Sequence, residues 1–389
     1  YILLLFFLLL LPFGQTTANG NDSIRLSLLT CAPGEEIYSL FGHTAIRYED
    51  PANGIDAVFN YGLFSFNTPN FIFRFSLGET DYQLGATDYA HFAAEYAFDG
   101  RSVWQQTLNL SKEEKAELIR LLQENYRPEN RVYRYNFFYD NCATRPRDKI
   151  EESIIGKVIY PSEPQDGSRS FRDIVHQYCK GHPWARFGID LCIGSEADRP
   201  ITQRQMMFAP FYLMDAFAGA QIANDSIQRP LVSDKALIVD AVSDEEEGGW
   251  MPTPLQCSLL LFILTAAATI YSLRKRTGLW GVDLVLFGTA GIVGCVLAFL
   301  ALFSEHPAVS SNFLLLVFHP GQFLFLPYII YCVRKGKKCW YLTLNLIVLT
   351  LFIAFFPLIP QRFDFAVVPL ALCLLIRSAS NLILTSKKK

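Results

Sequence analysis

The stretch Phe137–Asp148, FFYDNCATRPRD, places a cysteine between an aromatic run and a polar segment. The aromatic run ends at Asp140 and Asn141, and Cys142 follows at once. Asp and Asn are favoured N-cap residues, so either would begin a helix with Cys142 in its first turn. A thiol there lies among unpaired backbone N–H groups at the positive end of the helix dipole, which favours the thiolate. The stretch therefore predicts a nucleophile, which needs a base from elsewhere in the chain.

Composition divides the 389 residues into three parts. Residues 1–18 contain an apolar run followed by Thr16-x-Ala18, a pattern typical of a signal-peptide cleavage site. Residues 19–249 are mixed in composition and numerous enough for one sizeable domain. Residues 250–389 are overwhelmingly apolar, which predicts a transmembrane domain.

Charge follows the same division. Residues 251–389 hold 12 Lys and Arg against 3 Asp and Glu, a net charge of +9. Residues 1–250 hold 22 and 34, a net charge of −12. An acidic soluble half argues against nucleic acid as its partner.

The apolar part contains five segments of a length that spans a bilayer. Basic clusters occur at every second connection, which places those connections in the cytoplasm by the positive-inside rule. This predicts a multi-pass protein of the bacterial inner membrane, with residues 19–249 in the periplasm and a cytoplasmic C-terminus. The segments are 255–273, 281–303, 313–333, 340–359 and 365–385, and the basic clusters are 274–276, 334–338 and 387–389.

Four of the nine cysteines lie in the predicted periplasmic part, where disulfides persist. Cys179 and Cys192 are close in sequence and form the favoured bridge. Cys31 is then a packing residue and Cys142 a free thiol. A bridge between Cys31 and Cys142 is the competing arrangement, and it would remove the nucleophile.

A histidine early in the chain is the favoured base. His43 lies in a β-rich segment, Ile37–Tyr48, and residues 37–61 predict a hairpin with its turn near residues 52–53. In that register Asn60 lies opposite Ala45, on the same face as His43 and one diagonal step away. Asn60 is therefore a candidate to hold the imidazole. His176 and His182 are alternative bases, although each is more often structural.

Several other segments carry weaker expectations. Ser111 begins a capping box, and Ser170–Lys180 predicts a second capped helix. Alternation over Tyr133–Tyr139 predicts a strand that leads into Cys142. The aromatic-rich Phe64–Phe75 is interpreted as core, with a further strand or a lipid-facing surface as alternatives. Met206–Phe217 is interpreted as core or as a lipid-contacting lid, and Gln228–Gly249 as a polar linker. His319 and Arg377 are polar groups within predicted spans, which marks them as functional candidates, with a Pro-Gly kink beside His319 as the milder explanation.

Three motifs together resemble a known family. They are SLFGHTAIR at Ser39–Arg47, NYG at Asn60–Gly62 and DNCATRPRD at Asp140–Asp148, and several apolar spans follow them. This combination resembles the lipoprotein N-acyltransferases of the Bacteroides type, whose periplasmic domain is similar to the circularly permuted, papain-like NlpC/P60 group. The resemblance implies an α+β papain-like periplasmic domain, followed by an all-α membrane domain of about five transmembrane helices.

The resemblance also implies a reaction. Cys142 matches the nucleophile, His43 matches the base, and Asn60 falls where an orienting residue would lie. A membrane phospholipid would give its acyl chain to Cys142, and the α-amine of a diacylated lipoprotein would then accept it in a ping-pong sequence. This chemistry requires no cofactor and no metal.

Two other functions fit parts of the pattern. A membrane-tethered cysteine peptidase or amidase acting on peptidoglycan would use the same Cys–His pair. A non-catalytic envelope binding module would have Cys142 bonded to Cys31. The five spans and the apolar residues 206–217 favour a lipid substrate, and the absence of cell-wall-binding repeats points the same way.

Overall fold

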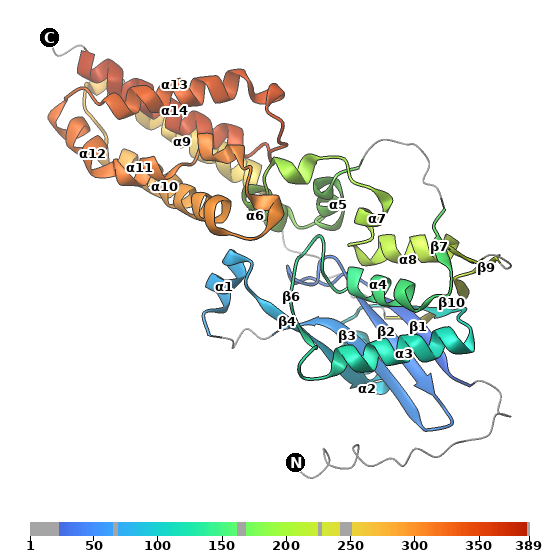
Figure 1. Ribbon diagram of the computed structural model, residues 1–389. Helices are drawn as coiled ribbons and strands as arrows, with labels where there is room; N and C mark the ends of the chain where they lie inside the picture. The colour runs from blue at the N-terminus through green and yellow to red at the C-terminus, as the bar shows by residue number, and fades with distance from the viewer. Residues whose placement is uncertain (1–22, 65–68, 162–168, 225–227, 242–250, 387–389) are drawn as a thin grey trace.

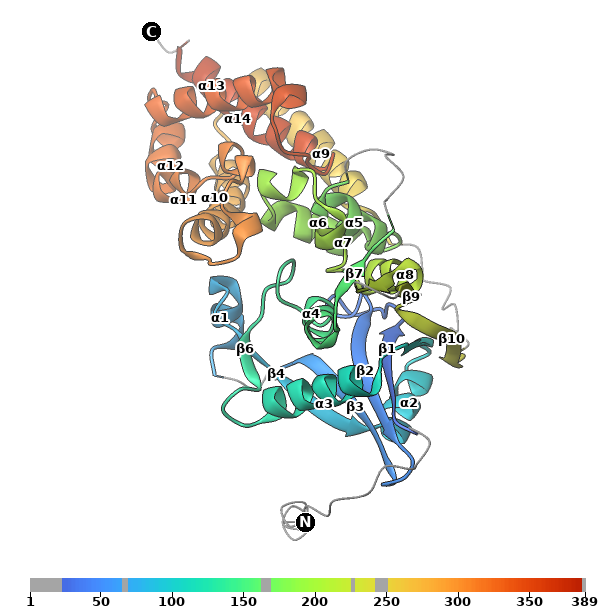
Figure 2. The ribbon, with the colours of Figure 1, turned by 45° about the vertical axis from the view of Figure 1, so that its right-hand side comes forward.

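The computed structural model describes residues 23–64, 69–161, 169–224, 228–241 and 251–386. The strands and the helices up to α8 form an α/β half, and α9 to α14 form a helical half (Figure 1). One end of the helical half faces the α/β half (Figure 2). The predicted order of a mixed α and β domain followed by a helical domain is confirmed.

A seven-stranded sheet of order β10-β5-β1-β2-β3-β4-β6 is the centre of the α/β half, and all neighbouring strands are antiparallel. The predicted hairpin is formed by β2 and β3, and its register pairs Ala45 with Asn60 as predicted. The strand begins later than expected, because residues 37–41 form turns. The strands are β1 (Arg25–Cys31), β2 (His43–Asp50), β3 (Ile55–Leu63), β4 (Asp81–Asp88), β5 (Val103–Leu108), β6 (Val132–Arg134) and β10 (Val232–Val239).

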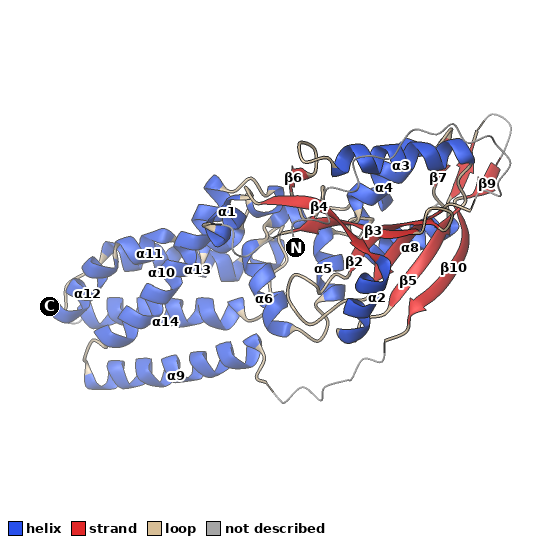
Figure 3. Ribbon diagram, turned by 90° about the horizontal axis from the view of Figure 1, so that it is seen from below, coloured by secondary structure: helices blue, strands red, loops and turns tan. Residues whose placement is uncertain are grey.

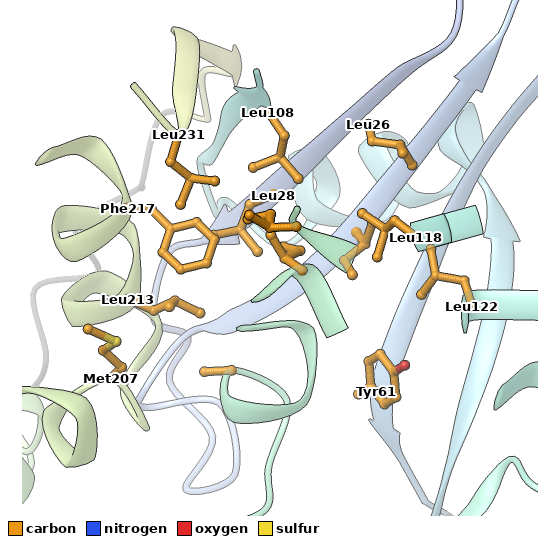
Figure 4. Close-up of a cluster of buried hydrophobic side chains, with 14 of the residues drawn as sticks. Leu26, Leu28, Tyr61, Leu108, Leu118, Leu122, Met207, Leu213, Phe217 and Leu231 are labelled. Atoms are coloured by element: carbon orange, nitrogen blue, oxygen red, sulfur yellow. The ribbon is translucent and has the colours of Figure 1, made fainter. Parts of the chain in front are cut away.

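Helices cover both faces of this sheet. On one face, α3 (Lys112–Tyr126), α4 (Thr144–Ser153) and α8 (Pro210–Gly219) pack against side chains such as Leu28, as Figure 4 shows for part of the cluster. On the other face, α2 (Tyr89–Phe98) packs against a cluster that includes Leu29. Consecutive residues of a strand point to opposite faces, so β1 contributes to both cores.

The predicted helix starts are confirmed. Ser111 and Glu114 form the reciprocal capping box of α3. Ser170 forms a second one with Asp173, at the start of α5 (Phe171–Tyr178). Each box satisfies backbone N–H groups that the first helical turn leaves without partners.

Three segments differ from their predictions. The strand expected over Tyr133–Tyr139 is short, because β6 ends at Arg134 and the chain then turns. Part of the expected linker is the edge strand β10, whose polar residues lie on an exposed face, while residues 242–250 lie outside the described ranges. The alternative of a lid at Met206–Phe217 is wrong, because most of its apolar side chains are buried in the cores.

A smaller layer lies between the main sheet and the helical half. This layer contains α5, α6 (Pro183–Cys192) and α7 (Gln203–Met206), and Figure 3 shows α5 and α6 between the sheet and the helical half. A separate short sheet of three strands lies beside α8. The short strands are β7 (Lys157–Ile159), β8 (Gln221–Ala223) and β9 (Gln228–Pro230).

Three helices of the described residues are long and apolar enough to cross a membrane, or four if one bent pair counts as a span. The three are α9 (Pro254–Lys275), α10 (Trp280–Phe303) and α14 (Val367–Ser386). The predicted span 313–333 is not one helix, because Pro320 starts a new helix after an irregular turn. It contains α11 (Pro320–Leu324) and α12 (Leu326–Lys335), and α12 meets α13 (Trp340–Ala354) at an angle of 111°.

The two polar residues that the sequence marked within the predicted spans have partners there. Arg377 on α14 and Asp283 on α10 are fully buried, and their nearest side-chain atoms are 2.7 Å apart. Asn381 donates a further hydrogen bond to Asp283. His319 lies beside the Tyr341 hydroxyl, which fits the milder explanation of a kink. Arg377 therefore joins α10 to α14.

The connections at one end of the helical half bind the α/β half. Arg362 forms ion pairs with Asp173 and Asp198. The backbone N–H of Gly194 donates to the carbonyl of Ala308 at 2.7 Å, and a Cβ at Gly194 would lie 2.6 Å from the Ser311 oxygen. Backbone thus packs directly on backbone at this junction.

Candidate active site

The turn before α4 is fixed by Asn141. Its side-chain oxygen accepts hydrogen bonds from the backbone N–H groups of Ala143 and Thr144, at 2.8 and 2.9 Å. Its carbonyl accepts from the backbone N–H of Arg145 at 3.2 Å, so helical bonding begins at this residue although the regular helix begins at Thr144. Of the two caps considered, Asn141 has this role, and Cys142 lies just ahead of the regular helix.

The same turn is held from outside by Arg145. Its guanidinium binds both carboxylate oxygens of Asp140, at 2.6 and 2.7 Å, and lies 3.5 Å above the ring of Tyr133. The Asn141 amide also donates to the carbonyl of Phe208, which ties the turn to the segment before α8. Cys142 is therefore presented by a turn with little freedom.

His43 is the first residue of β2 and is bonded to Asn60 on β3. The distance from His43 Nε2 to Asn60 Oδ1 is 3.2 Å, which confirms the predicted contact. The Asn60 amide nitrogen donates to Thr87 and to the Val58 carbonyl, so its oxygen faces the imidazole. The ring nitrogen Nε2 then carries the proton, which leaves Nδ1 as an acceptor.

Gly42 makes the entry of the chain into β2 possible. Its φ is 78°, and a Cβ there would lie 2.5 Å from the carbonyl oxygen of Cys31. Only glycine adopts this conformation at so close an approach. His43 is thus placed at the very start of the strand, directly opposite Cys31.

Cys142 lies beside the same ends of β2 and β3. The backbone N–H of Thr44, the residue after His43, donates to the Cys142 thiol. A Cβ placed on Gly62 at the end of β3 would be 3.6 Å from the Cys142 Cβ. Three residues far apart in sequence therefore converge: Cys142 from the turn before α4, His43 from β2 and Asn60 from β3.

Burial sets the charge state of this group. It raises the pKa of the Cys142 thiol to about 11, although the backbone N–H groups of Thr44 and Cys142 lower it. It lowers the pKa of His43 to about 4, against the effect of the bond to Asn60. The expectation of a stabilised thiolate is wrong, because desolvation outweighs the N–H groups at the helix start. Near neutral pH the site holds a thiol and a neutral imidazole.

The predicted disulfides are absent. All nine cysteines lie in the described ranges, and all are free thiols. Cys31 is fully buried, with its thiol bonded to the Tyr96 hydroxyl, and burial raises its pKa to about 12. Both bridges considered, Cys179–Cys192 and Cys31–Cys142, are therefore wrong for this structure, and Cys142 stays available as a nucleophile.

The alternative bases have other partners. His176 on α5 lies 2.9 Å from both carboxylate oxygens of Asp190. His182 lies 3.8 Å from Glu35, in the layer next to the helical half. Neither contacts the Cys142 turn, which leaves His43 as the histidine of this site.

Comparison with protein families covers both halves of the chain. The model of the Lnb N-terminal periplasmic domain matches residues 15–166, and the model of the Lnb transmembrane domain matches residues 245–389. The chain belongs to the Lnb family. It is a membrane protein of the lipoprotein N-acyltransferase type, with a periplasmic N-terminal domain. A search of curated proteins and a search of solved structures found no match.

The Lnb periplasmic match includes all three predicted site residues and one that sequence reasoning missed. Tyr133 was assigned only to a strand. Its hydroxyl is buried, has no hydrogen-bond partner among the described residues, and lies 4.0 Å from where a Cβ on Gly62 would be. The Cys142 Cβ is 3.6 Å from the same point, so the Tyr133 hydroxyl and the Cys142 side chain both border Gly62. The sequence offers one indication of Tyr133, its place two residues before Tyr135 in an alternating run. Such a run is equally typical of residues that only form the core.

Proposed function

We propose that this protein moves a fatty acyl chain from a membrane phospholipid to the α-amine of a diacylglyceryl-cysteine at the N-terminus of a lipoprotein. The observation that carries the proposal is the His43–Asn60 pair beside the buried thiol of Cys142, in a chain with both Lnb domains. A thiol, an oriented imidazole and a lipid surface are the requirements of acyl transfer through a thioester.

The first step forms an acyl-enzyme. The Cys142 sulfur attacks the ester carbonyl of the phospholipid while its proton passes to Nδ1 of His43. The tetrahedral intermediate collapses with cleavage of the bond to the glyceryl oxygen, and His43 returns the proton to that oxygen. A lysophospholipid leaves, and the acyl chain stays on Cys142 as a thioester.

The second step transfers the chain to nitrogen. The neutral α-amine of the lipoprotein cysteine attacks the thioester carbonyl and gives a proton to His43. The carbon–sulfur bond breaks, and the sulfur regains that proton as a thiol. The products are an N-acylated lipoprotein and the starting enzyme.

Each of the two steps passes through a tetrahedral intermediate, and its oxyanion needs hydrogen-bond donors. The backbone N–H groups of Cys142 and Thr44 face the sulfur, and the Tyr133 hydroxyl is a buried donor without another partner. Donors placed before the reaction stabilise a developing negative charge without having to reorient. We assign this role to Tyr133 together with the two backbone groups.

The uncharged resting state of Cys142 and His43 decides how the first step begins. Because the thiol and imidazole start uncharged, His43 acts as a general base during attack rather than as one half of an ion pair. Asn60 holds the imidazole so that its free nitrogen can face the sulfur.

The proposed orientation places the α/β half in the periplasm, on the inner membrane. The connections that bind the α/β half, around Ala308 and Arg362, lie at one end of the helices. The basic clusters that end α9 and α12 lie at the other end, which is the cytoplasmic one by the positive-inside rule. The C-terminus after α14 is then cytoplasmic.

Mass spectrometry of lipoprotein N-termini tests the function. Cells lacking this protein should accumulate diacylated forms, and wild-type protein or Cys192→Ala should restore N-acylation. Cys142→Ala should not restore it. Full N-acylation with Cys142→Ala would overturn the assignment of the nucleophile.

Purified protein tests the order of steps. Phospholipid alone should leave an acyl group on Cys142 that hydroxylamine removes, and adding a diacylated lipopeptide should discharge it. Acyl transfer that requires both substrates at once would contradict the thioester route. Cleavage of peptidoglycan peptides without any acyl transfer would show a peptidase instead.

A further inference from the structure

Helix α1 (Phe71–Leu77) is an apolar helix with no buried residue. Ile72, Phe73 and Phe75 are 80%, 57% and 47% exposed, so the expectation of core is wrong for α1 and the alternative of a lipid-facing surface fits it, whereas Phe64 packs against the core. A solvated helix with three large apolar side chains at its surface is unfavourable in water but stable against hydrocarbon.

Bonds to the helical half hold α1 at one depth. The backbone N–H of Glu305 donates to the Leu77 carbonyl at 2.8 Å, and His306 Nε2 donates to the Phe75 carbonyl at 3.0 Å. The rings of Phe73 and Phe299 are 5.7 Å apart. Helix α1 therefore lies against the periplasmic end of α10, the place where a membrane span leaves the bilayer (Figures 1 and 3).

An open groove of about 860 Å³ runs along the contact between α1 and α10. The side chains that line it are mostly apolar, and none is charged. They include Phe71, Ile72 and Phe73 on one wall and Cys295, Val296 and Phe299 on the other. Val296 is 52% exposed on a membrane span, so this wall of the groove is open to the hydrocarbon of the bilayer.

A row of aromatic rings joins the groove to the nucleophile. Phe71 stacks on Phe64 at 5.6 Å, Phe64 lies 5.0 Å from Tyr82, and Tyr82 stacks on Tyr135 at 4.2 Å. Tyr135 and Cys142 flank the same point above Gly62. The row is continuous, and its two ends are the groove wall and the thiol.

Charged residues lie close to α1 and to the loop after α10. Arg74 on α1 and Arg134 both bind Asp81, at 2.7 and 3.4 Å, and Arg134 also reaches Glu305 at 3.5 Å. Charged groups near an apolar groove match the division of a phospholipid into headgroup and chain.

We infer that the groove between α1 and α10 binds an acyl chain of the donor phospholipid, and that the aromatic row guides its ester toward Cys142. The inference rests on the proposed function and adds the place where the donor leaves the bilayer. The occupant is a hydrocarbon chain because the lining is mostly apolar, with Asn70 and Ser76 as its polar members, and because one wall is a helix that faces lipid.

Cross-linking tests the groove without any chemistry at the thiol. Full-length Cys142→Ala protein in nanodiscs is given a phosphatidylethanolamine with a photoreactive diazirine in one acyl chain. The yield of cross-links should be higher in residues 70–76 and 295–299 than on the lipid-facing side of α9. Equal labelling of α9 and of the groove would overturn the inference.

A space-filling variant tests it in the active protein. Val296→Trp should slow formation of the acyl-enzyme from long-chain phospholipid by about tenfold and leave a short-chain dihexanoyl phospholipid within about twofold. The control is Ile263→Trp on α9, at a side chain that is 62% exposed and away from the groove. That variant should match wild type with both lipids.

The outcomes separate the two proposals. Full activity of Val296→Trp on long chains would overturn the groove and leave the proposed function standing. Absence of any thioester on wild-type Cys142 would overturn the proposed function, while cross-links in the groove would still support lipid binding there.

Discussion

Two polar clusters of the α/β half differ in charge. The four side chains of the candidate site are neutral, namely a thiol, an imidazole, an amide and a phenol, and the Arg145–Asp140 ion pair borders them on the outside. Around Arg172 on α5 they are ionised: the guanidinium is fully buried and bonds Asp190 at 2.6 Å, Asp198 at 2.9 Å and two carbonyls. Both clusters are buried by their surroundings.

The difference in charge shows which role each buried cluster can have. Opposite charges that satisfy one another fix a geometry, and removing one partner leaves the other charge buried and unpaired. A neutral thiol and a neutral imidazole can pass a proton between them during a reaction, which a paired guanidinium does not do. The Arg172 cluster is accordingly assigned to the junction with Arg362, which shares Asp198, and the Cys142 cluster to chemistry.

The largest expected effect concerns stability. Arg172→Ala should lower the free energy of unfolding by about 3–5 kcal/mol, because Asp190 loses its buried partner. Arg204→Ala, whose side chain is half exposed, should cost less than about 1 kcal/mol. Thermal unfolding of the full-length protein in nanodiscs compares them. Equal melting temperatures for the two variants would remove the distinction between the clusters.

Tyr133→Phe should show the opposite pattern. Loss of an oxyanion donor should slow acyl-enzyme formation by about 10²–10³-fold. Stability should not fall, because the hydroxyl has no partner to lose. The matched control is Tyr61→Phe, which loses a 2.8 Å bond to Asn125 and should cost about 1 kcal/mol of stability with little change in rate. A Tyr133→Phe protein of normal rate would exclude Tyr133 from the oxyanion site.

Asn60→Ala should slow acyl-enzyme formation by about tenfold, or about 1.4 kcal/mol in the activation barrier. The imidazole then loses the bond that orients it but stays beside the thiol. Single-turnover kinetics with phospholipid measures the change. A loss as large as that of Cys142→Ala would show that Asn60 does more than orient the ring.

A pH profile tests the charge state of the thiol directly. With the pKa of Cys142 raised to about 11, the thiolate fraction increases about tenfold per pH unit below that value. Alkylation of Cys142 by iodoacetamide should therefore rise steadily from pH 7 to pH 10, after correction with Cys142→Ala. A rate that is already constant at pH 7 would indicate a thiolate and make the site as charged as the Arg172 cluster.

Local patterns predicted much of the α/β half and of the site. The hairpin register that joins His43 to Asn60 follows from side-chain alternation and one turn, and the capping boxes follow from residues three apart. These features depend on near neighbours in sequence, which is why they could be predicted.

Other features depend on contacts that no local pattern contains. The strand β10 joins the sheet through β5, more than 100 residues earlier in the chain. The acidity of Cys142 is set by how completely other segments bury it, and sequence showed only the helix start. The exposure of α1 depends on where α10 lies, and aromatic composition alone favoured a core.

Close packing at Gly194 limits how the two halves can change. The backbone of residues 194–195 is bonded to the carbonyls of Ala308 and Ser311, and even one added methyl group at Gly194 would strike Ser311. An α/β half from a related chain could be exchanged onto these helices only if both sides of that contact came with it. An insertion in the loop after α10 would likewise need a matching change near Gly194. The two halves differ in composition, but residues on the two sides of this contact have to change together, both in related sequences and in engineered ones.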